Sequence, residues 1–282
     1  MHKVLVTGGR GFIGTKLVSR LRNLSLDVIE ISSDFGDIAK SETWNSFQNL
    51  DVVFHLAGRN FVPESWNEPA EFFQTNVIGT EMALECCRRH GAKLIYISSY
   101  LYGVPKKIPI KETDKIKPNN PYALSKHLAE QICEFYATYW NIPITVIRPF
   151  NVFGPGQRSE FLIPKIINQI RNNSEVRVMD LEPKRDYIYV EDLVDALIKA
   201  IKIDDGYNIF NIGSGKSYSV GEIIRIIQEK AGTNLPVQSE NISRDHEIYD
   251  IKADVTFAKN NLGWIPKHTF SEGIEKLLAQ SK

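Results

Sequence analysis

The chain has 282 residues, 43% of them hydrophobic, which is enough for one large domain or a domain with a smaller lobe. Its 34 basic residues balance 34 acidic ones, so its charge argues against bulk attraction to nucleic acid or to an anionic membrane. The three cysteines form no CxxC and the six histidines show no metal-ligand spacing, which excludes a disulfide scaffold and predicts no metal site.

The first apolar run is too short for a signal peptide, since Thr7 and Gly8 interrupt it. No stretch approaches the ~18 apolar residues that a membrane span requires. We therefore expect a soluble, cytoplasmic protein with no membrane partner and no nucleic-acid partner.

Short β-branched runs alternate with helical patterns through the first half of the chain. The helical patterns cover residues 12–23, 69–90 and 122–140, and the runs between them are "KVLVT", "DVIEI", "DVVFHLA", "KLIYIS" and "PITVIR". Strands separated by amphipathic helices predict right-handed crossovers and a parallel sheet. The fold class expected is α/β, a Rossmann-type doubly wound sheet.

The rhythm changes after Arg148, where "RPFNVFGPGQRSEF" is a loop rich in glycine and proline. Beyond it the predicted strands become fewer and irregular. We expect residues 1–150 to form the nucleotide-binding domain, with elements near 185–212 returning to it. Residues 151–282 would mostly form a smaller substrate-binding lobe.

The stretch "TGGRGFIG" directly follows the first strand and opens the first helix. Glycines in this context permit positive φ, close approach to a pyrophosphate and tight packing of the helix on the strand. The helix N-terminus adds amide donors and partial positive charge for the phosphates. The predicted dinucleotide-binding loop comprises Gly8, Arg10, Gly11, Phe12, Ile13 and Gly14.

The end of the second strand indicates which nicotinamide cofactor binds. An NAD site usually has a carboxylate here for the ribose 2′-hydroxyl, but this chain has Ser32, with Asp34 two residues later. Hydroxyls and a nearby arginine, Arg10, favour the 2′-phosphate of NADP. We predict NADP, with NAD as the alternative. Asp37 and Ile38 are expected to hold the adenine.

A YxxxK pair lies at the start of the helical pattern 122–140. Tyr122 and Lys126 are one turn apart and therefore share a helix face. A free tyrosine has a pKa of about 10, and a neighbouring ammonium together with an oxidised nicotinamide would lower it. The strand of "KLIYISSYLYG" ends in Ser98 and Ser99, at the sheet edge where open α/β sheets bind ligands.

Taken together, these motifs resemble the extended short-chain dehydrogenase/reductase family, in the branch that acts on nucleotide-activated sugars. The similarity extends over nearly the whole chain. It rests on "TGGRGFIG", "FHLAG", "TNVIGT", "YISSYLYG", "NPYALSK", "RPFNVFGPGQ", "RDYIYVED", "NIGSG" and "ADVTFAKNNLGWIPK".

The resemblance implies a Ser–Tyr–Lys triad, with Tyr122 and Lys126 as two members. Alignment from the strand gives Ser99 as the third, whereas alignment back from "YG" gives Ser98. Because deletions fall in turns more readily than in buried strands, we predict Ser99 and keep Ser98 as the alternative.

Further site residues are carried over from the family. The resemblance implies that the nicotinamide lies against Phe150 and that the diphosphate of the substrate is bound by Asn151, Arg185 and Arg244. Arg244 matches least well, because "SRDHE" replaces the usual Arg-Pro-Gly-Asp stretch. The remaining cofactor contacts implied are Leu56, Ala57, Gly58 and Asn76.

The resemblance also bears on the reaction. Dehydratases of this family have an Asp-Glu pair after the catalytic hydroxyl, where this chain has Tyr100 and Leu101, which disfavours dehydration. The stretches 55–80 and 148–161 are more similar to GDP-4-dehydro-6-deoxy-mannose reductases than to galactose epimerases, although Tyr100 departs from that pattern. We predict an NADP-dependent reductase of a nucleotide-linked 4-keto-6-deoxyhexose.

Two alternatives stay open: a nucleotide-sugar 4-epimerase with tightly bound NAD, and a non-catalytic cofactor-sensing binder. Loss of triad residues would favour the binder, but all three are present. The family commonly dimerises through two helices per subunit, here those around residues 75–90 and 122–140, so a homodimer is expected.

Overall fold

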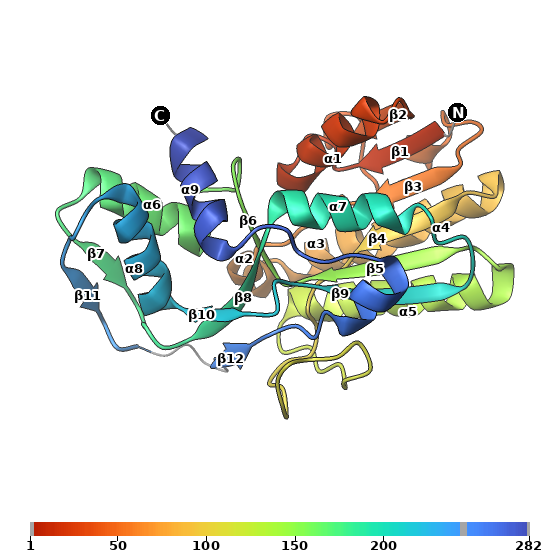
Figure 1. The fold of residues 1–282 in the computed structure, drawn as a ribbon. Coiled ribbons are helices and arrows are strands. Elements are labelled where there is room, and N and C mark those ends of the chain that lie inside the picture. Colours follow the sequence, from red (N-terminus) through yellow and green to blue (C-terminus); the bar gives the residue numbers. More distant parts are fainter. Residues whose placement is uncertain (1–2, 243–246, 281–282) are drawn as a thin grey trace.

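The computed structural model describes residues 3–242 and 247–280. Six parallel strands form its central sheet, in the order β2-β1-β3-β4-β5-β9 (Figure 1). This order reverses direction between β1 and β3, which confirms the predicted doubly wound Rossmann-type sheet. The strands are β1 (Lys3–Thr7), β2 (Asp27–Ile31), β3 (Val52–His55), β4 (Lys93–Ile97), β5 (Ile144–Pro149) and β9 (Tyr207–Ile212).

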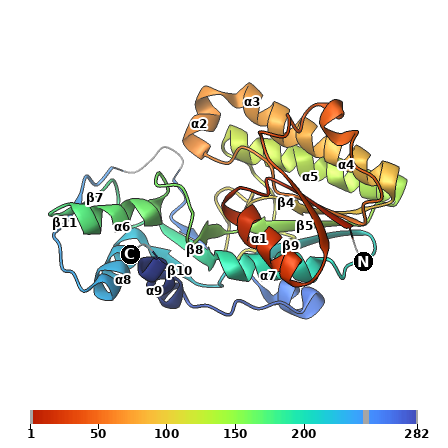
Figure 2. The same ribbon diagram turned by 90° about the horizontal axis from the view of Figure 1, so that it is seen from above.

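Helices cover both faces of this sheet (Figure 2). On one face lie α1 (Phe12–Asn23) and α7 (Val190–Ala200), and on the other α4 (Gly79–His90) and α5 (Pro121–Trp140). Residues of β1 alternate between the two cores: Val4 and Val6 pack with α1 and α7, whereas Leu5 packs with α4 and α5. Burial on both faces explains why the strands are continuously apolar.

Two connections depart from a regular βαβ crossover. Between β2 and β3 the chain makes only a short 3-10 helix, η1 (Ser41–Trp44), whose Trp44 is buried in the core. After β3 come α2 (Val62–Asn67) and α3 (Pro69–Phe73), and a π-helical turn, η2 (Gln74–Ile78), leads directly into α4. Such π turns occur frequently at functional sites, because they change the direction of one side chain.

The second half of the chain builds a smaller lobe around β8 (Lys184–Tyr189). This strand pairs with β6 (Asn151–Phe153), β10 (Ser217–Ser219) and β12 (Asp250–Ile251). Three helices with their own apolar core pack on it, and they lie together at one end of the molecule (Figure 1): α6 (Leu162–Asn172), α8 (Val220–Ala231) and α9 (Phe270–Gln280).

The remaining short elements are β7 (Val176–Val178), which pairs with β11 (Val237–Ser239), and the π turn η3 (Ala258–Leu262). Of the elements near residues 185–212, α7 and β9 return to the central sheet, whereas β8 belongs to the smaller sheet. The division into two domains at residue 150 stays a prediction. None of the helices among the described residues has the length and apolar composition to cross a bilayer.

Candidate active site

The glycine loop between β1 and α1 has the shape that a dinucleotide phosphate needs. Gly8 has a φ of +69°, and a Cβ added to it would lie 2.9 Å from the Ala57 backbone nitrogen. A Cβ on Gly14 would lie 2.1 Å from the Gly8 carbonyl oxygen. No side chain caps the start of α1 at Gly11, so the first amides of that helix face the loop. These residues therefore fit a nicotinamide dinucleotide.

Arg10, Ser32 and Asp34 meet at the end of β2. The Arg10 backbone N–H donates a hydrogen bond of 3.1 Å to the Ser32 hydroxyl oxygen, and the Arg10 guanidinium forms an ion pair with Asp34. Both charged side chains are exposed, 66% for Arg10 and 60% for Asp34. Asp34 thus pairs with Arg10, and the arginine stands beside the position where an NAD site has its acid.

Asp37 and Ile38, the two residues predicted to hold the adenine, are both engaged within the protein. The Asp37 carboxylate accepts a hydrogen bond of 3.0 Å from the Ala39 N–H, which shapes the loop after β2. Ile38 is only 8% exposed, and a Cβ on Gly79 would meet it at 2.8 Å. Little of the Ile38 side chain is free, so its role beside the adenine stays a prediction.

The first turn of α5 positions the YxxxK pair. Asn120 caps this helix, accepting a hydrogen bond of 2.8 Å from the Ala123 N–H, and Pro121 occupies the first helical position. Tyr122 therefore lies at the helix start, where its side chain is beside Ser99.

Burial governs the titration of this pair. Desolvation raises the pKa of Tyr122 to about 12, although the hydrogen bond from Ser99 opposes this shift. Among the protein groups alone, desolvation is the dominant cause; the lower pKa expected from the ammonium together with an oxidised nicotinamide stays a prediction. Burial also lowers the pKa of Lys126 to about 7, while Glu130 acts in the opposite direction. The Lys126 ammonium lies 4.4 Å from the centre of the Tyr96 ring.

Asn76 ties the loop after β3 to the catalytic helix. Asn76 belongs to the π turn η2. Its side-chain oxygen accepts a hydrogen bond of 2.9 Å from the Arg59 N–H, and its amide nitrogen donates one of 2.9 Å to the Ser125 hydroxyl. Ser125 in turn donates to the Tyr122 carbonyl at 2.8 Å. A Cβ on Gly58 would approach the Asn76 oxygen at 2.8 Å, so glycine is needed there. Asn76 thereby fixes the position of the first turn of α5.

The two candidate serines have different surroundings. Ser99 lines the large cleft together with Tyr122. Ser98 is 3% exposed, and its hydroxyl oxygen has no partner among the residues that the structure describes. This geometry supports Ser99 as the triad serine, which stays a prediction.

A cleft of about 570 Å³ opens between the catalytic edge of the sheet and the smaller lobe. A volume of this size falls within the usual range for small-molecule sites. It brings together predicted residues from distant parts of the chain, namely Ser99, Tyr122, Asn151 and Arg185.

The predicted substrate contacts already have protein partners. The Asn151 amide donates to the Asp186 carbonyl at 3.2 Å. The Arg185 guanidinium pairs with Glu247 and also donates to the Ile248 carbonyl. Arg244 lies outside the described residues. Phe150 is buried, and its ring stacks on Tyr100 at 5.5 Å between centroids.

The sequence did not single out the wall that α6 and β7 contribute to this cleft. Phe161, Lys165 and Arg177 line it, and Phe161 meets Phe61 edge-on at 5.9 Å between ring centroids. Phe161 ends the stretch 148–161, whereas Lys165 and Arg177 belong to no motif and reach the cleft only through the packing of the smaller lobe. Within the described ranges, no three His, Cys, Asp or Glu side chains are grouped so that they could hold a metal ion.

Comparisons with known proteins agree with this geometry. A model of the NAD dependent epimerase/dehydratase family matches residues 4–213. The chain belongs to this family. It is 30% identical to a UDP-glucose 4-epimerase of Lactobacillus helveticus, over 98% of this chain and 95% of the relative. It is 29% identical to a GDP-6-deoxy-D-mannose reductase of Pseudomonas aeruginosa, over 99% and 96% respectively.

A solved structure of RMD from Pseudomonas aeruginosa complexed with NADPH superposes with a TM-score of 0.91 at 27% identity, covering 99% of this chain and 98% of that one. The predicted family, the Rossmann-type fold and the enzyme class, a short-chain dehydrogenase/reductase acting on nucleotide sugars, are thereby confirmed. The nearly equal identity to an epimerase and to a reductase does not choose between the two reactions.

Proposed function

We propose that this protein is an NADP-dependent reductase of a nucleotide-linked 4-keto-6-deoxyhexose. The observation that carries the proposal is the end of β2, where Ser32 replaces the acid that an NAD site uses and its hydroxyl is hydrogen-bonded to the Arg10 backbone. A 4-ketoreductase consumes a reduced cofactor and must release the oxidised form, whereas a 4-epimerase retains NAD.

In this reaction the glycine loop would hold NADPH, whose chemistry when bound is to provide a hydride for C4 of the sugar. Ser99 hydrogen-bonds the carbonyl oxygen and, through its contact with Tyr122, holds that oxygen beside the phenol. Because the pKa of Tyr122 is raised to about 12, the phenol carries the proton that the new alcohol oxygen requires. The ammonium of Lys126 favours the phenolate that remains.

The other polar groups of the cleft bind the nucleotide diphosphate in this proposal. Arg185 and Asn151 line the cleft from the side of the smaller lobe, opposite the sheet edge that contributes Tyr122. Arg185 would exchange its ion pair with Glu247 for the diphosphate charges. Phe150, buried under Tyr100, would lie beside the nicotinamide.

The second candidate is a nucleotide-sugar 4-epimerase with bound NAD. The observation in its favour is the exposed Asp34, which reaches the guanidinium of Arg10 and so offers a carboxylate near the ribose. An epimerase would use the same Tyr122 alternately as base and acid.

Two measurements separate the candidates. Mass spectrometry of the denatured protein identifies a copurified cofactor, and assays with NADPH or NADH on UDP-, GDP-, CDP- and dTDP-linked 4-keto-6-deoxyhexoses measure reduction. We expect no retained NAD, and NADPH oxidation with one of these substrates. Stoichiometric NAD together with interconversion of UDP-glucose and UDP-galactose would instead identify the epimerase.

A homodimer is part of the proposal. Near the end of α5 three aromatic side chains are exposed, Phe135 by 49%, Tyr139 by 68% and Trp140 by 44%. Exposed aromatic clusters of this kind favour an interface. Sedimentation at the mass of a single chain at micromolar concentration would contradict the dimer.

A further inference from the structure

Residues 104–117, here called the lysine loop, leave the catalytic edge of the sheet after Gly103 and return to it at Pro118. At its base the Lys117 N–H donates to the Leu101 carbonyl at 3.0 Å. At its far side Ile110 bonds to the chain after β12, through the Lys252 carbonyl and the Asp254 N–H, both at 2.8 Å. Backbone hydrogen bonds therefore hold the loop at its base and near its middle.

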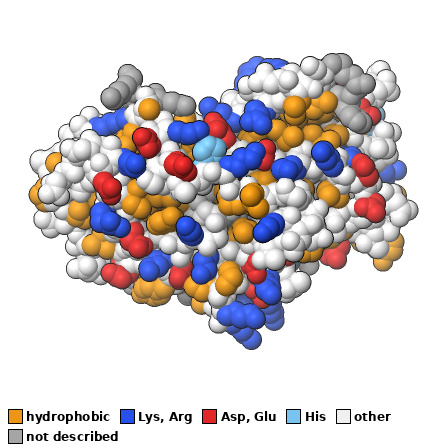
Figure 3. All heavy atoms as spheres, viewed as in Figure 1, with side chains coloured by type: hydrophobic (Ala, Val, Ile, Leu, Met, Phe, Trp, Pro, Cys, Tyr) orange, Lys and Arg blue, Asp and Glu red, His pale blue; other side chains and the backbone are white. Residues whose placement is uncertain are grey.

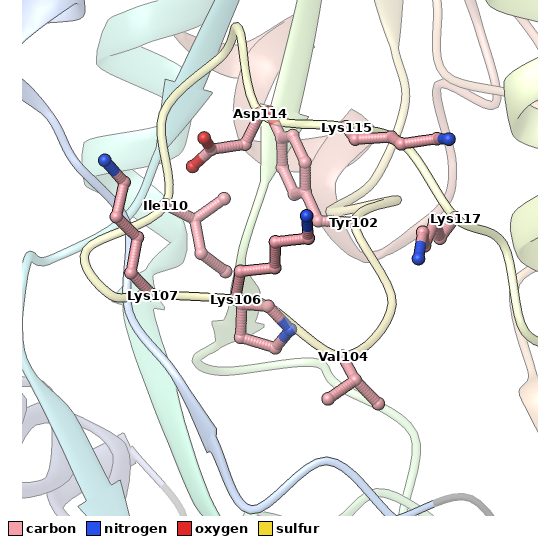
Figure 4. A pocket seen from close by; sticks show the side chains of 9 residues that line it. Tyr102, Val104, Lys106, Lys107, Ile110, Asp114, Lys115 and Lys117 are labelled. Atoms are coloured by element: carbon pink, nitrogen blue, oxygen red, sulfur yellow. The ribbon is translucent and has the colours of Figure 1, made fainter.

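This loop encloses a cavity of about 230 Å³, separate from the large cleft. Tyr102 and Ile110, exposed by 2% and 1%, form its apolar floor. Four lysines line it. In Figure 4, Lys106 lies in the middle, Lys107 lies on one side, and Lys115 and Lys117 lie on the other.

The charge of the lysine loop is unbalanced. It carries five lysines against Glu112 and Asp114, a net charge of +3 (5 − 2), in a chain whose formal net charge is zero. The same concentration of cationic side chains is visible at the lower tip of the molecule in Figure 3. Within the described part of the chain the lysine ion pairs involve Lys93, Lys230, Lys267 and Lys276, and none belongs to this loop.

The two acids of the loop compensate only part of its lysine charge. The Glu112 carboxylate is turned inward, where it accepts from the Asn211 N–H at 2.8 Å. The Asp114 carboxylate accepts from the Lys111 N–H at 2.8 Å and still lines the cavity. Of the four lysines on the cavity lining, Figure 4 shows Lys106 over Tyr102, with the ammonium groups of Lys107 and Lys115 on opposite sides, and Asp114 is the one carboxylate of that lining.

From this arrangement we propose that the lysine-rimmed cavity is a second binding site, which takes a sugar phosphate. Ammonium groups bind phosphate as compact charges with three donors each. The floor of Tyr102 and Ile110 suits the apolar face of a sugar ring, and the Asp114 carboxylate can accept from its hydroxyls. The cavity is below the ~300 Å³ at which drug-sized sites begin, so the ligand is small.

The site shares a wall with the large cleft. Leu101 and Gly103 line the cleft, whereas Tyr102 between them lines the cavity. A Cβ on Gly103 would lie 2.3 Å from the Lys117 carbonyl oxygen, which shows how closely the two sides of the loop base pack. The assignment of the cavity does not depend on which reaction the cleft performs.

The experiment is a calorimetric titration of glucose 6-phosphate into the full chain, with NADP and GDP present in excess to occupy the large cleft. Val104, which lines the cavity and is 64% exposed, is the position to substitute. Val104→Asp and Val104→Asn have nearly the same shape and differ in charge. We expect the Asp variant to bind at least tenfold more weakly than the Asn variant, because the added carboxylate repels phosphate.

A second pair of variants tests the lysines. Lys106→Gln with Lys107→Gln should weaken binding at least tenfold, whereas Lys202→Gln with Lys259→Gln, two exposed lysines elsewhere, should leave it unchanged. Wild-type binding should also weaken with added salt. No binding of glucose 6-phosphate at millimolar concentration, or equal affinities within either pair, would overturn the proposal. So would retention on heparin without sugar-phosphate binding, which would make the lysines a general electrostatic surface.

Discussion

The two ends of the cofactor site hold their polar groups in opposite ways. At the catalytic end Lys126 is 4% exposed and Asn76 is 1% exposed, and desolvation shifts the pKa values of Lys126 and Tyr122. At the adenosine end Arg10 and Asp34 form an ion pair with both side chains more than half exposed. The residues proposed for catalysis thus lie where water is excluded and electrostatic interactions are strong. The residues proposed to select the cofactor lie where water screens their charges.

The sharpest test of the catalytic end is Tyr122→Phe. The change removes the phenolic proton and keeps the ring, whose edge packs against Phe72 at 6.3 Å between centroids. Because a positioned general acid contributes about 10²- to 10⁴-fold, we expect kcat to fall by that factor. NADPH binding, followed by nicotinamide fluorescence, should persist. Unchanged kcat would remove Tyr122 from the chemistry.

Gly14→Ala tests the loop that joins the two ends. Its new Cβ would meet backbone atoms, the nearest of them the Gly8 carbonyl oxygen, so no side chain can move aside. We expect at least a ~100-fold loss of cofactor affinity, from loss of close helix–strand packing. Gly221→Ala is the matched control, since its Cβ would have ordinary contacts at 3.8 Å. Equal affinity for NADPH in both variants would contradict this role.

Lys126 makes the buried end sensitive to pH. Its pKa is about 7 in the folded protein and 10.5 ordinarily, so below pH 7 both states are charged and the desolvation cost is fully present. Between pH 7 and 10.5 the unfolded state binds more protons than the folded state. The free energy of unfolding therefore rises with pH, by at most ~1.4 kcal/mol per pH unit. Lys126→Met should therefore stabilise the protein most at pH 6, with a gain that shrinks towards pH 10.5. A gain independent of pH, measured by denaturant unfolding, would contradict the shift.

His55, beneath the same site, changes the stability in the same direction as Lys126 but at lower pH. Burial lowers its pKa from 6.5 to about 3, so as pH falls below 6.5 the unfolded state takes up a proton that the folded state refuses. At pH 5 this costs about 2 kcal/mol relative to neutral pH. His55→Asn should flatten the acid side of the stability profile between pH 6.5 and 3. Parallel profiles for both proteins would show that other groups dominate.

The sequence predicted what local patterns encode. The Rossmann-type fold followed from alternating strands and helices, and the glycine loop is confirmed as the turn from β1 into α1. The sequence could not give burial, so it did not reveal that desolvation raises the pKa of Tyr122. It also did not identify Lys165 and Arg177, because α6 and β7 reach the cleft only through packing of the smaller lobe.

The choice between Ser98 and Ser99 shows where pattern and geometry meet. Two adjacent residues at a strand end point in opposite directions, so only one of them can face Tyr122. The structure has Ser99 in the cleft and the Ser98 hydroxyl buried without a partner among the described residues. The argument that deletions fall in turns and the alternation of side chains along the strand therefore both favour Ser99.

The exposed end should respond most weakly, and Arg10→Ala measures it. If Arg10 leaves Asp34 to bind the 2′-phosphate, its loss should lower kcat/KM for NADPH about tenfold, the low end for a charge-assisted contact because water screens it. The value for NADH should stay nearly constant, since NADH has no phosphate there. Asp34→Asn should have the opposite effect, because it removes the ion-pair partner of Arg10 and should raise the preference for NADPH. Ser32→Asp should lower that preference, because the added carboxylate repels the 2′-phosphate. An Arg10→Ala variant that loses both cofactors equally would mean that this arginine does not read the 2′-phosphate, and the epimerase would become the better proposal.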